Sequence, residues 1–170
     1  MSQKRTVLDL ERYVPALITF ISNKLSHGAS SAYRRMFGVG ITEWRLLAML
    51  AIEPGISANR ICQVMGYDKA LVSRTLRVLD ENGHVKIEAD PQDSRRSVVT
   101  LTTAGYALHD RILAVALARE DQLLTGLSAA ECDTLMGLLR RMLANTEAIP
   151  ATGTALPRIG AKRIKTTKLV

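Results

Sequence analysis

The sequence of 170 residues has only 4% aromatic residues, two cysteines, and no apolar run long enough to cross a bilayer. Cys62 and Cys132 lie far apart and outside any CxxC or Cys/His spacing, which argues against a metal site. We interpret both as reduced thiols that behave as small apolar residues. No secretion signal is apparent, because Asp9, Glu11 and Arg12 interrupt the N-terminal apolar residues. We therefore expect a cytoplasmic protein with no membrane partner and no metal.

The sequence also lacks a recognisable catalytic constellation. Gly38-Val39-Gly40 contains two glycines of a dinucleotide loop, but the remaining glycine and the strand–helix–strand setting are missing. Asp90 and Asp93 could act as paired carboxylates in acid–base chemistry. They lie in a turn beside arginines, however, where hairpin geometry explains them better. We expect no enzyme activity and no cofactor.

The formal net charge of +7 comes mostly from one end of the chain. Residues 151–170 contain five basic residues and no acidic one, whereas the rest has 18 basic against 16 acidic residues. Net charge is therefore weak support for nucleic-acid binding, and the clustering of basic residues is the stronger signal. Residues 150–170 combine Pro, Gly, Thr and Lys without a period, which predicts a flexible basic tail.

The stretch 56–102 has the most informative local pattern. Ser57 is suited to cap a short helix whose apolar stripe consists of Ala58, Ile61, Cys62 and Met65. Gly66-Tyr67 ends this helix, since glycine supplies the left-handed backbone of a tight turn. A second helix is predicted over residues 68–82. Two helices around a glycine turn are typical of a helix-turn-helix, whose second helix enters the major groove of DNA.

The second helix divides into two sides at about 100° per residue. Its predicted apolar side consists of Leu71, Val72, Thr75, Leu76, Val78 and Leu79. Its polar side offers cations and a hydroxyl, which suit phosphates and the acceptor edges of bases, from Lys69, Ser73, Arg74 and Arg77. A solvated helix face would show the same pattern, so the flanking elements decide between the two interpretations.

A β-hairpin is predicted directly after this helix. Gly83 ends the helix, and residues 84–89 alternate polar and apolar as a half-buried strand does. Residues 90–97 resemble a turn-forming loop, and residues 98–101 form the returning strand. Arg95 and Arg96 lie at the tip, where they could reach phosphates or a minor groove. Such a hairpin behind a recognition helix is a wing, and it favours the DNA-binding interpretation.

The hairpin carries the motif Asp90-Pro91-x-Asp93-x-Arg95-x-x-x-Val99-x-Leu101-Thr102-x-x-Gly105, behind Val72-Ser73-Arg74. With Ile41-Thr42-Glu43-Trp44-Arg45-Leu46-Leu47 upstream and Leu127-Ser128-x-x-Glu131 downstream, it resembles the MarR family of bacterial transcription regulators over roughly residues 12–146. The resemblance implies a winged helix-turn-helix homodimer that binds pseudo-palindromic operator DNA and releases it when a small molecule binds. It also implies that Asp93 braces the wing tip by hydrogen bonding.

Long amphipathic helices flank the predicted DNA-binding unit. One runs from Tyr13 to Phe37, weakened midway at residues 28–31, and Thr42 is expected to cap the next, which ends near residue 53. Thr102 is expected to cap a helix to about residue 125, and a Ser128/Glu131 capping box begins the last helix. Their apolar stripes exceed the needs of one small domain. We divide them between core and dimer interface, as the family resemblance implies.

We therefore expect a mainly α fold with a small β-hairpin wing, a winged helix-turn-helix with flanking dimerisation helices. Residues 1–149 would form one domain, with the DNA-binding unit at about 42–102, dimerisation helices at about 12–38 and 102–146, and the tail at 150–170. The expected function is that of a ligand-responsive repressor of unknown effector. An architectural or protein-interaction protein without a discrete operator is the alternative. Peroxide-sensing relatives carry a reactive cysteine in the first helix, which lacks one here, so a thiol switch is disfavoured.

Overall fold

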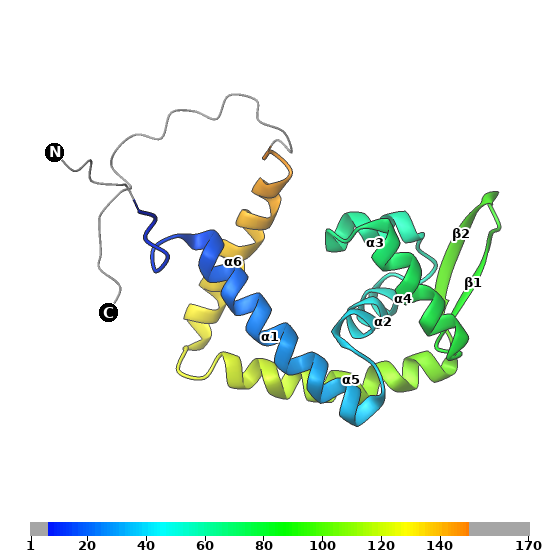
Figure 1. Ribbon diagram of the computed structural model, residues 1–170, viewed down its shortest axis with the longest axis horizontal. Helices are drawn as coiled ribbons and strands as arrows, with labels where there is room; N and C mark the ends of the chain where they lie inside the picture. The colour runs from blue at the N-terminus through cyan, green and yellow to red at the C-terminus, as the bar shows by residue number, and fades with distance from the viewer. Residues whose placement is uncertain (1–6, 150–170) are drawn as a thin grey trace. The chain divides into compact units, whose positions relative to one another are not determined.

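The expected mainly helical fold with one antiparallel hairpin is present in a computed structural model of the chain (Figure 1). The structure describes residues 7–149, except for the side chains of residues 94 and 95. Within that range the elements are α1 (Val14–Phe37), α2 (Ile41–Ile52), α3 (Ala58–Met65), α4 (Lys69–Glu81), β1 (Val85–Asp90), β2 (Asp93–Leu101), α5 (Thr103–Leu123) and α6 (Ala129–Thr146). The basic tail predicted at 150–170 lies outside the described residues.

The chain divides into two compact units. The winged unit is residues 23–120, and the terminal unit is, among the described residues, 7–22 together with 121–149. The buried core belongs to the winged unit, with its largest fully buried side chains on α2, α3, α4, β2 and α5: Leu46, Leu47, Leu50, Ile61, Val72, Leu79, Val99 and Ile112. The core therefore gathers around the predicted DNA-binding stretch.

The helix-turn-helix forms as the local signals predict. The Ser57 hydroxyl accepts a hydrogen bond from the Arg60 amide at 3.2 Å, which caps α3. Gly66 ends α3 in the left-handed conformation, with φ 66° and ψ 24°. The Asp68 carboxylate then caps α4 by accepting from the Leu71 amide at 2.7 Å. These bonds satisfy helix-end amides that would otherwise lack partners.

Thr42 does not cap α2, so that prediction is wrong. The helix begins at Ile41, two residues earlier than a cap at Thr42 would place it, and its N-cap is Gly40 in an extended conformation without a side-chain hydrogen bond. The Trp44 amide donates to the Gly40 carbonyl at 3.1 Å, so Thr42 already lies in the first turn. Glycine is tolerated at an N-cap, so α2 can start from Gly40 without a side-chain cap.

The weak middle of α1 neither breaks nor interrupts the helix, which runs unbroken through residues 28–31. Ala29 and Tyr33 are buried just beyond Gly28, so packing outweighs the low helix propensity of glycine. Tyr33 meets Trp44 edge-on at 6.2 Å between ring centroids, and Trp44 stacks on His109 at 5.4 Å. These rings join the second half of α1 to α2 and α5. Burial raises the pKa of Tyr33, against an opposing effect of the Arg119 charge.

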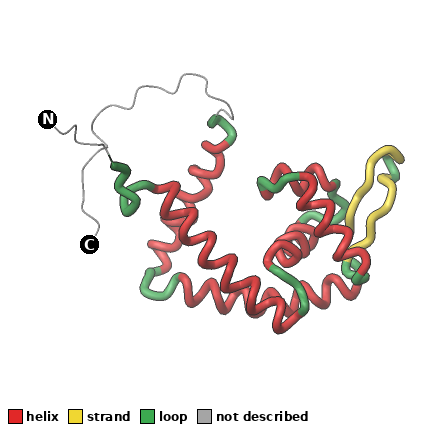
Figure 2. The backbone as a smooth tube through the Cα atoms, in the orientation of Figure 1, coloured by secondary structure: helices red, strands yellow, loops and turns green. Residues whose placement is uncertain are grey.

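The hairpin is longer than predicted, because most of the expected loop at residues 90–97 is strand (Figure 2). The strands pair from Val85 opposite Leu101 to Ala89 opposite Ser97, and the register then shifts to Asp90 opposite Asp93. Two residues suffice for the turn, in which the Gln92 amide donates to the Asp90 carboxylate at 2.8 Å. Arg95 and Arg96 therefore belong to β2, inside the shifted stretch.

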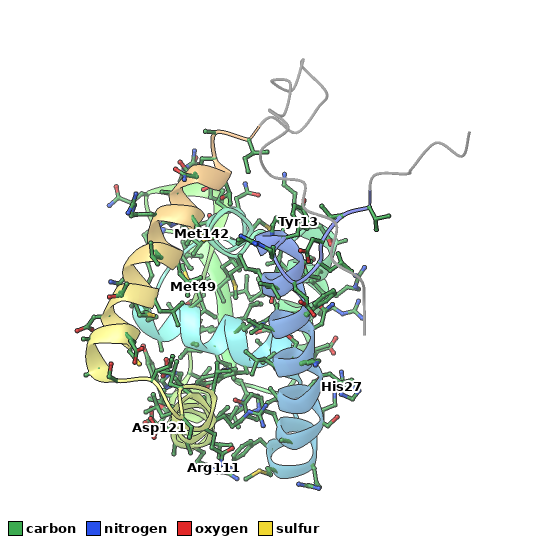
Figure 3. The ribbon with its side chains drawn as sticks, turned by 90° about the vertical axis from the view of Figure 1, so that its left-hand side faces the viewer. Tyr13, His27, Met49, Arg111, Asp121 and Met142 are labelled. Carbon is green, nitrogen blue, oxygen red and sulfur yellow. The ribbon has the colours of Figure 1, made fainter. Side chains whose placement is uncertain are left out.

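The terminal unit exposes apolar side chains along its helices. The Ser128/Glu131 capping box begins α6 as predicted, yet α6 has no buried residue. Its exposed apolar residues include Leu138, Leu139 and Leu143, and α1 adds Leu17, Ile18 and Ile21. Tyr13 and Met142, labelled in Figure 3, are also exposed. In residues 7–149 no helix is long and apolar enough to cross a membrane.

Candidate nucleic-acid interface

Helix α4 is held in the winged unit by one side only. Val72 and Leu79 are fully buried, and Thr75 and Leu76 nearly so. The buried Thr75 hydroxyl donates to the Leu71 carbonyl at 2.9 Å, so this polar group is satisfied inside the core. The helix packs against α2, α3 and β1 (Figure 1). Its opposite side is therefore fixed in an outward orientation.

All four polar residues predicted on that outward side are exposed: Lys69, Ser73, Arg74 and Arg77. The Arg77 guanidinium forms an ion pair with Glu81 one turn later, with Nε 3.3 Å from Oε1. Among the described residues, neither Lys69 nor Arg74 has an ion-pair partner. These two cations can meet an anion without first releasing a carboxylate.

Val78 departs from the predicted apolar side of α4, because 40% of it is exposed. Leu71 is only half-buried. The buried stripe of α4 is therefore narrower than the sequence pattern suggested. The width of the buried stripe depends on which neighbouring elements pack against α4. Here they leave Val78 partly exposed, beside the basic face.

The wing tip carries a charged pair. Arg96 Nε lies 3.5 Å from Asp93 Oδ2, and 73% of the Arg96 side chain is exposed. The Arg95 side chain lies outside the described residues. The sequence also allows Arg95 to pair with Asp93 within the hairpin, and the structure places Arg96 beside Asp93. That Asp93 braces the wing remains a prediction.

The junction between α4, the wing and α5 is closely packed. Gly83 adopts φ 71°, and the His84 amide donates to the Leu79 carbonyl at 2.8 Å. The Thr102 hydroxyl donates to the Gly83 carbonyl at 2.6 Å and accepts from the Gly105 amide at 3.0 Å, which caps α5 as predicted. A Cβ at Gly105 would overlap the His84 carbonyl oxygen. The backbones of the turn and of α5 thus meet where only glycine fits.

Backbone hydrogen bonds attach the wing to the body on its other side. The Val99 amide donates to the Ile56 carbonyl at 2.9 Å, and the Gly55 amide donates to the Val99 carbonyl at 3.0 Å. Strand β2 is consequently anchored at Val99, while the tip extends beyond this anchor point. The two predicted DNA-contacting elements thus belong to one connected body within the winged unit.

Sequence reasoning did not single out two exposed cations near these elements. Arg60 on α3 forms a two-point ion pair with Glu53, with Nε–Oε1 and Nη2–Oε2 distances of 3.2 and 3.3 Å. Lys86 on β1 pairs with Glu88 at 2.7 Å. The strand alternation could have revealed Lys86, and the polar side of α3 could have revealed Arg60. Both are already paired with carboxylates.

Other chemistries find little support in the described part of the chain. No group of three or more His, Cys, Asp or Glu residues there could hold a metal ion. Cys62 and Cys132 are free and partly buried. The exposed cations of α4, together with Arg96 on the wing, are the candidate residues that the sequence predicted and whose placement the structure describes.

Comparison with known proteins relates this arrangement to DNA-binding regulators. A model of the MarR family matches residues 37–96. A putative transcriptional regulatory protein for the hcr operon of Thauera aromatica is 28% identical over 106 residues. That match covers 62% of this chain and 64% of the relative, so the chain spans just under two thirds of the relative's length.

Solved structures share the fold over most of the chain. A MarR/EmrR family transcriptional regulator from Acinetobacter sp. ADP1 is 33% identical, with a TM-score of 0.78, covering 84% of this chain and all of that one. The S. aureus MepR–DNA complex has a TM-score of 0.70 at 24% identity, covering 80% of this chain and 98% of MepR. The latter likeness is one of fold.

Proposed function

The chain belongs to the MarR family, and on that premise we propose that it is a sequence-specific DNA-binding transcriptional regulator acting as a homodimer. The observation that carries the proposal is the orientation of α4. Its buried side anchors it in the core, and its outward side presents Lys69, Ser73, Arg74 and Arg77. Double-stranded DNA is the partner that this face suits, because the major groove admits a helix and offers acceptor edges to such side chains.

The proposed contacts divide between base reading and phosphate binding. Arg74 and Arg77 can bind guanine by two hydrogen bonds or neutralise a phosphate, and Lys69 and Ser73 can add phosphate or base contacts. Arg95 and Arg96 on the wing would reach phosphates or the minor groove. Asp93 would hold Arg96 at the wing tip, which the 3.5 Å distance between them supports.

Exposed apolar side chains support the homodimer. Val14, Leu17 and Phe20 of α1 are at least 40% exposed, and 68% of Leu143 on α6 is exposed. A large apolar surface of this kind usually marks a protein interface. We propose that the helices at about 12–38 and 102–146, which flank the DNA-binding unit at about 42–102 in the sequence, pair with a second copy. Two-fold symmetry would then place the recognition helices about 34 Å apart, one DNA turn.

The proposal for regulation rests on family membership rather than on a described site. We propose a repressor that releases its operator when a small molecule binds, with the ligand left unspecified. No enzymatic role is proposed. A cytoplasmic location is part of the same proposal, because a regulator must reach the chromosome.

Selection of bound fragments from genomic DNA tests the proposal. The full chain would be mixed with the fragments at fixed salt, and the enriched sites compared with an unrelated duplex of equal length. A regulator with a discrete operator binds it at least about 10³-fold more tightly than the unrelated duplex. Equal affinity for the enriched sites and the unrelated duplex would instead indicate an architectural protein. If the enriched sites are preferred, the genes that lie beside them would suggest the pathway and the inducer.

A further inference from the structure

Arg45 on α2 joins two segments that are distant in the sequence. Its Nη1 donates a hydrogen bond to the Tyr67 hydroxyl oxygen at 2.9 Å, and its Nη2 donates to the Ser26 hydroxyl oxygen at 3.0 Å. All three side chains are half-buried. Within the described residues no carboxylate forms an ion pair with Arg45. The cation is therefore held by two neutral hydroxyl groups.

The Tyr67 hydroxyl is well placed to affect the recognition helix. Tyr67 lies between Gly66, which ends α3, and Asp68, which caps α4. Its backbone thus belongs to the turn from which α4 starts. Ser26 lies on α1, and the three residues all belong to the winged unit. Arg45 consequently ties the turn before α4 to both α2 and α1.

We propose that Arg45 is a positioning residue for base reading by α4, an inference that rests on the proposed function. The guanidinium stays protonated, and its planar fork holds two acceptors in one fixed geometry. Hydrogen bonds from a charged donor are also stronger than those between neutral groups. The contact therefore restrains the turn and, through the turn, the start of α4. Residues that read DNA must be held to about half an ångström, and supporting hydrogen bonds provide that restraint.

Base contacts and phosphate contacts should respond differently when the restraint is lost. A base edge accepts a hydrogen bond only over a narrow range of positions, whereas phosphate attraction varies slowly with distance. Loosening the turn should therefore weaken binding to the preferred sequence and leave nonspecific binding unchanged. Replacing a residue that contributes only to stability would not weaken operator binding while leaving nonspecific binding unchanged.

Two matched variants isolate the contact. Tyr67→Phe removes the acceptor at the turn and keeps the ring, whereas Ser26→Ala removes the other acceptor and leaves the turn contact intact. Each variant deprives the same guanidinium of one partner, so a similar loss of stability is expected. We expect Tyr67→Phe to weaken operator binding about tenfold, the scale of one hydrogen bond to a charged group, and Ser26→Ala by less than about twofold. Neither should change affinity for an unrelated duplex or its salt dependence.

Arg45→Lys tests the geometry of the donor. It keeps the charge but offers no planar fork, so it should behave like Tyr67→Phe rather than like the wild-type protein. Equal operator affinity in Tyr67→Phe and Ser26→Ala would overturn the proposal. A parallel loss of nonspecific affinity in Tyr67→Phe would also overturn it, because Arg45 would then be structural only.

Amide hydrogen exchange on the full chain tests, without DNA, whether Arg45 restrains the turn before α4. Tyr67→Phe should exchange faster than Ser26→Ala at residues 67–72, where the Leu71 amide donates to Asp68. Equal exchange in the two variants contradicts a positioning role whatever the DNA results. If the wild-type chain shows no preferred operator, the proposed function fails, and the exchange comparison still decides whether Arg45 restrains the turn.

Discussion

Arg74 and Arg77 lie on the same exposed face but differ in their neighbours. Arg77 is paired with Glu81, whereas Arg74 has no ion-pair partner among the described residues. We expect Arg74→Ala and Arg77→Ala each to weaken operator binding without changing the thermal unfolding midpoint. Loss of a base contact should cost about 1–3 kcal/mol and relax preference at one base pair, whereas loss of a phosphate contact weakens all sequences alike. Titration against single-substituted operators separates these outcomes.

Glu81→Gln serves as the matched control for that comparison. It frees Arg77 and removes a negative charge from the basic face, so operator affinity should rise. The exposed pair contributes only about 0.3–0.5 kcal/mol to stability, so folding should be unaffected. Unchanged operator affinity in both arginine variants would contradict the placement of α4 in the groove.

Gly105 is the residue whose replacement should most disturb the junction of α4, wing and α5. A Cβ there would overlap the His84 carbonyl oxygen, and a backbone atom cannot rotate away as a side chain does. We expect Gly105→Ala to destabilise the fold by roughly 1–3 kcal/mol, the usual cost of forcing extra volume into a packed site. Thermal or denaturant unfolding measures the effect.

Gly137 on α6 provides the opposite case, because a Cβ there meets nothing within 4 Å. Gly137→Ala should stabilise the helix by roughly 0.5–1 kcal/mol, since alanine is the better helix former. If both variants shifted stability alike, the contact at Gly105 would not explain the change.

At the scale of elements, the wing should supply affinity without sequence preference. Arg95→Ala should weaken binding to every duplex and lower the salt slope by about one unit, because each neutralised phosphate releases roughly one counterion. Binding to specific and unrelated duplexes over a range of salt concentrations measures this. An unchanged slope would mean that Arg95 does not reach DNA. The same measurement on Arg96→Ala tests whether Arg96 reaches DNA.

The stability that the capping box at the start of α6 contributes should depend on pH. Hydrogen bonds from the Ser128 backbone amide and then from its hydroxyl lower the pKa of Glu131. A lowered folded-state pKa means that the carboxylate stabilises the fold above its unfolded pKa. That stabilisation is lost as the pH falls through the folded value. Stability should therefore decline in acid more steeply in the wild-type chain than in Glu131→Gln, which cannot titrate at this position.

Thermal unfolding from about pH 6 to about pH 3, which spans the ordinary titration of glutamate, measures that difference. Ser128→Ala removes the hydroxyl but keeps the backbone amide, so an intermediate slope is expected. Parallel curves for wild type and Glu131→Gln would show that the capping box does not contribute.

At the scale of the whole molecule, the exposed apolar residues of the terminal unit should hold the dimer together. Leu143→Glu places a charge on α6, and we expect it to shift the protein toward monomer and to weaken operator binding, since both half-sites are needed. Sedimentation measures the oligomeric state. Ile52→Glu is the matched control, because Ile52 is 82% exposed but lies outside the proposed dimerisation helices. Equal effects of the two substitutions would contradict the proposed interface.

Much of the local structure follows from the sequence alone. The caps at Ser57 and Ser128 depend on residues within three positions of one another, so their spacing is sufficient to identify them. The glycine turn at Gly66 and the outward side of α4 likewise follow from local conformation and periodicity. The wing motif and its flanking segments were also enough to identify the family, because they extend over most of the chain.

Other features were decided by tertiary packing. Thr42 could cap a helix by its chemistry, but α2 begins at Ile41, two residues earlier than such a cap would place it. Val78 follows the apolar period of α4, yet 40% of it stays exposed. Arg95 and Arg96 belong to β2 because β2 pairs with β1 nearly to the turn, with a register shift between Ala89 and Asp90. The Arg45 bridge joins residues about twenty positions apart on either side. The periodicity of a sequence depends only on residues that are close along the chain, whereas these contacts form when segments distant in the sequence pack together.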